Sequence, residues 1–233
     1  MPPAPIDVRD RMGQGFTGWR PIGPDTVIGI AVHHSVSGGL FFTAAQMTVD
    51  DELNHLLMID AYHVSKGWGG FAYHLAAFPS GRYYLCGSLN GARAHVYKRN
   101  HELVGVVLIG DFTAAAPPRA QRQAAGRCLA YIGAVYPGRP VKGHRDWAVP
   151  ESPTACPGDT WRGWIHALES PEAEEEDYMK VIVARPSSRC FLISGPRPFY
   201  IATLVELGFW QALLGPLVEV TDTAIDMVIA RAA

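Results

Sequence analysis

Two uninterrupted apolar runs, residues 27–32 and 103–109, are the clearest features of the hydrophobic pattern along the chain. Runs of this length that are rich in β-branched residues are typical of strands buried on both faces of a sheet. Apolar positions recur at helical spacing over residues 44–64, and a Pro-Pro pair opens a second helix over residues 117–135. The pattern predicts an α/β fold with a central mixed sheet flanked by helices.

Turn and capping residues mark the boundaries of the smaller elements. A Pro-Ser-Gly turn lies between strand-like segments at residues 71–78 and 82–85, which predicts a β-hairpin. Thr43 is a candidate N-cap for the first helix, and Gly67 is placed to end it. A last short strand is expected near residues 140–142.

Composition divides the chain into four segments. Residues 1–26 are rich in proline and glycine and predict an irregular lead-in, and a catalytic domain is expected over residues 27–168. Residues 169–177 form an acidic block with a proline, which repels itself into an extended linker. Residues 178–233 predict a small α+β module. Its expected elements are two strands and then two helices, at residues 178–184, 190–194, 200–207 and 223–232.

Charge and cysteine usage exclude several classes of function. A formal net charge of −2 gives no reason to expect the basic surface that nucleic-acid binding requires. No apolar run reaches the roughly 18 residues of a membrane span, so we expect no membrane insertion. The first residues lack a secretory leader, which predicts synthesis in a cytoplasm. The four cysteines have no paired spacing, and we expect Cys86 and Cys128 to be buried as small apolar residues.

The candidate chemistry lies where strands end. His33 and His34 follow the first apolar run, and because successive strand residues face opposite sides, only one of the two can enter a given site. His144, in a Gly-His-Arg-Asp stretch, and Cys156, in a Thr-Ala-Cys-Pro-Gly stretch, are both soft enough to bind zinc. Structural zinc sites use four protein ligands, often in Cys-x-x-Cys pairs, which this chain lacks. An open, catalytic type of zinc site is therefore favoured, with a third ligand from another part of the chain.

These motifs, together with Tyr73-His74 and His95 followed by Asn100, occur in an order that resembles one known family. Over about residues 25–168 the chain resembles the zinc-dependent N-acetylmuramoyl-L-alanine amidases, which share a fold with peptidoglycan-recognition proteins and include phage endolysins. The resemblance implies a single zinc ion, and the ligands that it implies are His33, His144 and Cys156. It also implies catalytic roles for Tyr73 and Thr154, although many phage enzymes of the family carry lysine at the latter position.

The resemblance extends to residues around the metal. It places His95 and Asn100 near the substrate groove, and Trp68 either lines that groove or packs under it. We interpret His34 and His74 as residues that support the ligands from behind. The implied partner is peptidoglycan, and we expect a monomer.

The implied activity is cleavage of the amide between the lactyl group of N-acetylmuramic acid and the L-alanine of the stem peptide. The expected setting is a phage endolysin that is made in the host cytoplasm and acts on the cell wall after release. Two alternatives remain at this stage: a recognition protein of the same fold without activity, and a zinc peptidase that cuts within the stem peptide. The C-terminal module either binds the wall or packs on the catalytic domain as a stabilising flap.

Overall fold

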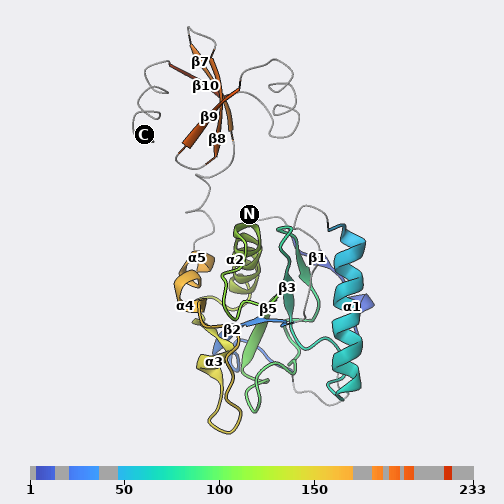
Figure 1. Cartoon of the computed structure of the whole chain (residues 1–233). Coiled ribbons are helices and arrows are strands. Elements are labelled where there is room, and N and C mark those ends of the chain that lie inside the picture. The colour runs from blue at the N-terminus through green and yellow to red at the C-terminus, as the bar shows by residue number, and fades with distance from the viewer. Residues whose placement is uncertain are drawn as a thin grey trace. The chain divides into compact units, whose positions relative to one another are not determined.

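The computed structural model describes residues 4–13, 21–36 and 47–169, together with four strands of the C-terminal part, at residues 180–185, 189–194, 197–201 and 218–221. The chain divides into two compact units, Met1–Pro171 and Glu172–Ala233 (Figure 1). Among the described residues, no helix combines the length and the apolar character that a membrane crossing would need.

The larger unit is built on a six-stranded sheet with the strand order β1-β4-β3-β5-β2-β6. The strands are β1 (Ile6–Asp7), β2 (Gly29–His34), β3 (Leu75–Ala77), β4 (Tyr83–Leu85), β5 (Leu103–Leu108) and β6 (Val141–Gly143). Neighbouring strands run parallel except β3 and β4, which form the predicted hairpin. The two predicted buried strands pair with each other as β2 and β5, and every residue of both is buried.

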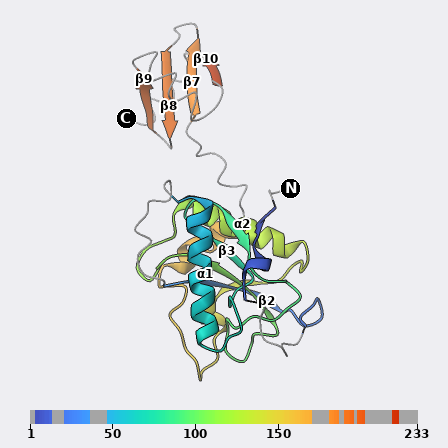
Figure 2. The same cartoon turned by 90° about the vertical axis from the view of Figure 1, so that its right-hand side faces the viewer.

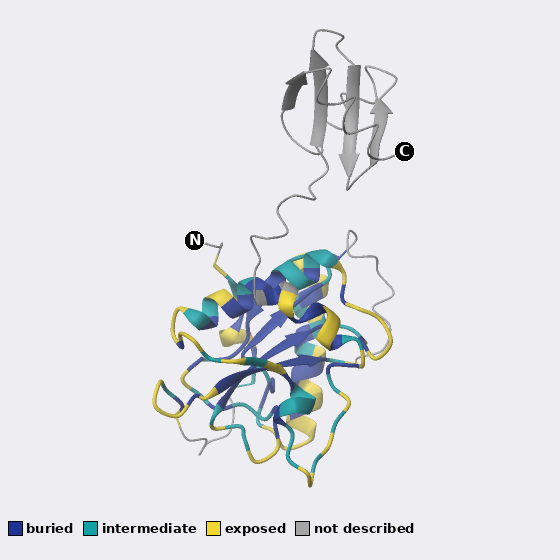
Figure 3. Cartoon of the chain, turned by 90° about the vertical axis from the view of Figure 1, so that its left-hand side faces the viewer, coloured by how far each residue is buried: buried dark blue, intermediate teal, exposed yellow. Residues whose placement is uncertain are grey.

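The two long helices cover opposite faces of this sheet (Figures 1 and 2). They are α1 (Val49–Ser65) and α2 (Arg119–Gly133), and η1 (Arg9–Arg11), α3 (His144–Trp147), α4 (Trp161–Trp164) and α5 (His166–Glu169) are short. On β5, Val106 packs in the apolar cluster beneath α2, whereas Val107 packs in the cluster beneath α1. The buried residues follow the sheet and the inner faces of the helices (Figure 3). The predicted α/β architecture is confirmed.

The start of α1 differs from the prediction. The helix begins at Val49 rather than near residue 44, and Thr48 caps it, whereas Thr43 lies outside the described residues. The Thr48 hydroxyl accepts from the backbone N–H of Asp51, whose carboxylate accepts from the N–H of Thr48. This reciprocal capping box satisfies two N–H groups that the first turn cannot pair. The predicted end is confirmed, since Gly67 follows the helix with a φ of 77°.

Two other predictions about the larger unit need correction. The lead-in is not wholly irregular, because β1 pairs with β4 and the N–H of Val8 donates to the carbonyl of Leu85. Such a pairing across many residues leaves no local pattern in the sequence. The strand predicted over residues 71–78 is limited to β3, and β2 extends through both histidines instead of ending before them.

The smaller unit contains a four-stranded sheet with the order β10-β7-β8-β9. Its strands are β7 (Lys180–Arg185), β8 (Arg189–Ser194), β9 (Arg197–Ile201) and β10 (Val218–Thr221). The two predicted strands are confirmed as the antiparallel pair β7 and β8. The helix predicted from Tyr200 is wrong at its start, because Tyr200 belongs to β9 and pairs with Phe191 of β8. The rest of that segment and the helix expected at residues 223–232 lie outside the described residues.

Candidate metal centre

Strand β2 delivers one histidine to each face of the sheet. His33 is 1% exposed, and its ring lies 4.5 Å from that of His144 and 4.9 Å from that of Tyr73, centroid to centroid. His34 turns toward the other face, where its Nδ1 accepts from the N–H of Phe112 at 3.1 Å. The alternation expected for a strand thus selects His33 as the histidine of the site.

His144 reaches the same place by the pairing of β6 with β2. Val32 is opposite Gly143, the last residue of β6, in the parallel register, so His33 on β2 and His144 at the start of α3 follow the same point of the sheet and lie close together. Gly143 itself has no room for a side chain, because an added Cβ would lie 2.8 Å from Cδ of Pro157. Close packing of the loop after α3 on the end of β6 therefore depends on a glycine at this position.

The loop that carries Cys156 is held by hydrogen bonds at both sides of the cysteine. The Thr154 hydroxyl accepts from the N–H of Cys156 at 3.1 Å, and the carbonyl of Cys156 accepts from the N–H of Arg145 at 2.9 Å. The Arg145 guanidinium also donates to the carbonyl of Gly158. These contacts aim the thiol at β2, where the N–H of His34 lies 3.4 Å from its sulfur.

Together these elements place three metal-binding atoms in one cluster. One ligand atom each of His33, His144 and Cys156 lies within 4.8 Å of the other two, and Sγ of Cys156 is 3.8 Å from Nδ1 of His33. Ligands of a tetrahedral zinc ion are about 3.3–3.8 Å apart, given zinc bonds of about 2.0–2.3 Å. The distance from sulfur to His33 falls in this range, and the donors are the nitrogen and sulfur atoms that zinc prefers. It is the only such group of ligands found in the part of the chain that the structure describes.

Burial sets the protonation of the three ligands. It holds the pKa of His33 well below its usual range and lowers the pKa of His144 to about 4, so both rings are neutral and able to bind a cation. Burial also raises the pKa of the Cys156 thiol to about 12. A thiolate at this position needs a positive charge beside it, which a zinc ion supplies. The donor set therefore fits a divalent cation.

Two hydroxyl groups border the cluster. Tyr73 lies against His33, and burial, with a smaller contribution from Cys156, raises the pKa of its phenol. The phenol keeps its proton at neutral pH and can act as a hydrogen-bond donor. Thr154 uses its oxygen as an acceptor for the N–H of Cys156, which leaves its hydroxyl hydrogen available as a second donor.

A cavity of about 410 Å³ begins at Tyr73 and runs along α1. Its lining residues are Ser35, Val36, Met58, Ile59, Tyr62, His63 and Tyr73. Met58 and Tyr62 are each 56% exposed and border this cavity, which is named here the α1 groove. Trp68 stacks against His63, with ring centroids 5.1 Å apart. Its predicted contact with substrate stays a prediction.

The other predicted substrate residues occupy different positions. His95 is buried, and its two ring nitrogens lie 3.1 Å from Nε2 of His33 and 3.1 Å from the carbonyl oxygen of Leu103. The Asn100 side-chain oxygen accepts from the backbone N–H groups of His95 and Val96. Both side chains make hydrogen bonds within the protein, and their predicted contact with substrate stays a prediction.

The two histidines interpreted as support for the ligands differ in their distance from the cluster. His34 contacts the sulfur of Cys156 through its backbone N–H. His74 bonds only to the backbone at its ring nitrogens, accepting from the N–H of Gly105 and donating to the carbonyl of Gly91. Its ring meets His95 edge-on at 5.7 Å, so it lies one residue further from the metal ligands.

Sequence reasoning missed the contribution of α1 to the site. Met58 and Tyr62 are four positions apart and thus share one helix face, and His63 adjoins them with its Nδ1 accepting from the N–H of Ala72. The sequence did contain a signal, because Met58 and Tyr62 are large apolar residues of α1 that lie outside the stripe facing the core. The sequence alone does not show that Ser35 and Val36, which follow β2, line the same cavity as these α1 residues.

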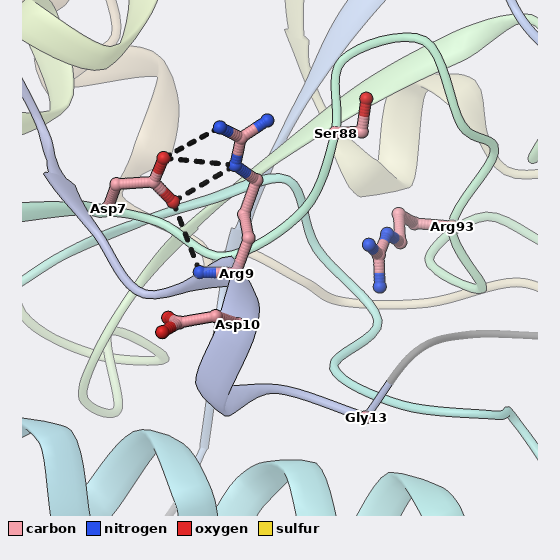
Figure 4. Close-up of a pocket in the computed structure, with 6 residues that line it drawn as sticks. All are labelled: Asp7, Arg9, Asp10, Gly13, Ser88 and Arg93. Atoms are coloured by element: carbon pink, nitrogen blue, oxygen red, sulfur yellow. Dashed lines mark hydrogen bonds and ion pairs between the residues drawn. The ribbon is translucent and has the colours of Figure 1, made fainter.

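A second cavity, of about 690 Å³, lies at the N-terminal segment of the larger unit (Figure 4). Its lining residues are Asp7, Arg9, Asp10, Gly13, Ser88 and Arg93. Asp7 and Arg9 form an ion pair on one side, and Arg93 donates to the carbonyl of Phe71 on the other. None of these residues belongs to the metal cluster or to the α1 groove.

Comparisons with known proteins agree with this site. A protein-family model described as N-acetylmuramoyl-L-alanine amidase matches residues 23–159, which include all three ligands. The chain is 29% identical over 132 residues to peptidoglycan-recognition protein LB of Drosophila melanogaster, an alignment that covers 55% of this chain and 53% of that protein. It is 30% identical over 114 residues to N-acetylmuramoyl-L-alanine amidase of Homo sapiens, covering 45% of this chain and 19% of that protein.

A solved structure shows the same fold. The chain is similar to the amidase LysC from Clostridium intestinale URNW, with a TM-score of 0.52 and 22% identity, over 72% of this chain and 98% of that one. The chain spans about half the length of the Drosophila relative and about a fifth of the length of the human one.

Proposed function

The chain belongs to the N-acetylmuramoyl-L-alanine amidase family, and we propose that it is a zinc hydrolase that cleaves the amide between the lactyl group of N-acetylmuramic acid and L-alanine. The observation that carries this proposal is the cluster of His33, His144 and Cys156, with Tyr73 against it and the α1 groove beside it. A recognition surface alone needs a groove but no open metal site.

The ligand set suits hydrolysis of an unactivated amide. Zinc, when bound, supplies a Lewis acid and a water whose pKa is lowered to about 7. Two neutral imidazoles and one thiolate leave the centre with a net positive charge, which favours the negative charge that develops on the carbonyl oxygen. The N–H of His34 donates toward the thiolate and so stabilises its charge.

Tyr73 and Thr154 are the residues placed to act on the substrate itself. Tyr73 stays protonated and donates a hydrogen bond toward the oxyanion, and Thr154, bonded to the N–H of Cys156, offers its hydroxyl hydrogen as a second donor. Preorganised donors of this type contribute about 10²-fold or more to turnover in comparable oxyanion sites. Neither residue is a proposed metal ligand, so their removal separates chemistry from metal binding.

The α1 groove is the proposed binding site of the stem peptide. It begins at Tyr73, so a peptide bound along Met58 and Tyr62 has one end at the metal centre. Exposed apolar side chains favour contacts with the methyl and methylene groups of short-chain amino acids. The glycan is then placed on the other side of the scissile amide.

Two other functions on this fold are tested by one experiment. A recognition protein without activity leaves purified peptidoglycan intact, and a zinc peptidase releases fragments cut within the stem peptide. Mass spectrometry of digested cell walls distinguishes them, because the proposed amidase releases peptides that begin with L-alanine and leaves free lactyl groups on the glycan. Peptides that lack their first residue would contradict the proposed bond.

The proposed setting is a phage endolysin made in the bacterial cytoplasm and active on the wall as a monomer. The arrangement of a catalytic unit and a second compact unit supports it. We propose that the second unit binds the wall and that residues 169–177 are the linker. Digestion of walls from several bacterial groups, with and without residues after 171, tests this assignment.

A further inference from the structure

We infer that His95 is a positioning residue that fixes the proton of His33 on Nε2, so that His33 binds the metal through Nδ1. The inference rests on the proposed zinc site, but it concerns the protein's own hydrogen bonds.

The carbonyl of Leu103 determines the tautomer of His95. A carbonyl oxygen only accepts hydrogen bonds, so Nε2 of His95, 3.1 Å away, carries a hydrogen and donates it. A neutral imidazole carries a single N–H, and here the bond to Leu103 places it on Nε2. Nδ1 of His95 therefore has a lone pair and acts as an acceptor.

The tautomer of His33 then follows from that of His95. Nδ1 of His95 lies 3.1 Å from Nε2 of His33, and an acceptor requires a donor opposite it. His33 thus carries its hydrogen on Nε2 and its lone pair on Nδ1. This Nδ1 is the atom that lies 3.8 Å from Sγ of Cys156, on the side of the metal cluster. A chain of two donated hydrogen bonds, from His33 through His95 to β5, points the lone pair at the metal position.

The surroundings of His95 hold its ring in place. The Asn100 side chain accepts from the N–H of His95 at 2.9 Å and so fixes the backbone there. Gly105 of β5 leaves space for the ring, since an added Cβ would lie 2.9 Å from Cγ and Nδ1 of His95. His95 is therefore built into the sheet behind His33, which is the position of a residue that orients a ligand.

Zinc affinity of the full-length protein, measured by competition with a chromophoric chelator, tests this role without using hydrolysis as the readout. His95→Leu removes both hydrogen bonds, and we expect zinc affinity to fall about 10–100-fold, as is typical when a partner of a metal-bound histidine is lost. His95→Gln offers an oxygen to accept from His33 and an amide to donate to Leu103, so it should restore most of the affinity. His101→Leu, at an exposed histidine of the same loop, is the matched control and should bind zinc like the wild type.

A spectroscopic measurement decides the tautomer directly and needs no variant. In proton–nitrogen correlation spectra of isotope-labelled, zinc-loaded protein, His33 should show its hydrogen on Nε2 and the metal on Nδ1. The inference is overturned by the opposite assignment, or by unchanged zinc affinity in folded His95→Leu. Loss of affinity in His95→Leu and His95→Gln alike would also contradict it, because it would show that ring packing and not hydrogen bonding is required. If the protein binds zinc as expected but releases no peptide from peptidoglycan, the proposed function fails while this inference stands.

Discussion

The backbone N–H of His34 points at the sulfur of Cys156 across 3.4 Å, so the strand that carries one proposed metal ligand, His33, also contacts a second. A thiolate that accepts a backbone hydrogen bond is stabilised without the cost of ordering a side chain. The position of Cys156 thus depends on β2 as well as on its own loop.

The first prediction concerns the metal. Cys156→Ala should lose most of its bound zinc, because two imidazoles alone leave the site without its anionic ligand. Chelation of the wild type should abolish hydrolysis, and added zinc should restore it. Metal content after dialysis is the measurement, and Cys128→Ala, the same change at a buried cysteine of α2, is the control. Equal zinc in Cys156→Ala and the wild type would reject the ligand assignment.

The second prediction separates catalysis from metal binding. Tyr73→Phe should keep its zinc and lose turnover by about 10²-fold, because the change removes a donor to the oxyanion and not a ligand. Thr154→Ala should lower turnover by a smaller factor, since the Thr154 hydroxyl is already bonded to the N–H of Cys156. Release of peptide from purified walls gives both rates. Tyr97→Phe, at an exposed tyrosine, is the control and should turn over like the wild type. Near-normal turnover in Tyr73→Phe would show that Tyr73 only packs against the site.

The third prediction tests the glycine between β6 and α3. Gly143→Ala should lower both zinc affinity and the free energy of unfolding, because the new Cβ would meet Pro157 and the ring of Trp161. Gly133→Ala is a matched control at the last residue of α2, where an added Cβ meets nothing within 4 Å. It should stabilise the protein by up to about 1 kcal/mol through helix propensity. Chemical denaturation of both variants compares the two, and equal stabilities would show that the loop can move away from β6.

The fourth prediction concerns Glu52, a buried carboxylate in the first turn of α1. Glu52 is fully buried and accepts hydrogen bonds from Ser80, Arg82 and Tyr84. Glu52→Leu should cost about 1–3 kcal/mol in the free energy of unfolding, because it leaves the hydroxyls of Tyr84 and Ser80 without their acceptor, whereas the Arg82 side chain is 33% exposed and can turn to water. Glu151→Ala removes an exposed ion pair with Lys98 and should cost at most about 1 kcal/mol. Urea unfolding curves measure both costs, and similar small values would show that water replaces the lost acceptor.

The fifth prediction concerns the second unit. A protein that ends at Pro171 should hydrolyse soluble muropeptides at close to the full-length rate, because the ligands and donors all precede residue 160 and the core residue Leu168 is retained. On intact walls it should be slower, since tethering raises the effective concentration of substrate. A large fall in its melting temperature, with lost activity on soluble muropeptides, would instead support a stabilising flap.

The sequence was most informative where burial on both faces left an uninterrupted apolar run, as in β2 and β5. It was less informative where similar residues compete, since Thr43 and Thr48 are equally good caps and only the reciprocal bonds with Asp51 decide between them. The role of His95 depends on a partner 62 positions away and on a backbone carbonyl, and neither leaves a local pattern. Tyr200 has no helix-specific signal, so pairing with β8 decides its conformation.

The distance along the chain between the ligands has a consequence for how the protein is made. Cys156 and His33 are 123 positions apart and meet only after β6 has paired with β2. Closing so long a loop precedes any gain from metal coordination, so an incomplete chain on the ribosome has two separated histidines and no site. If the cluster binds zinc as proposed, uptake should therefore be a late event in biosynthesis, and the amount of bound zinc should report the fraction of molecules in which β6 has joined the sheet.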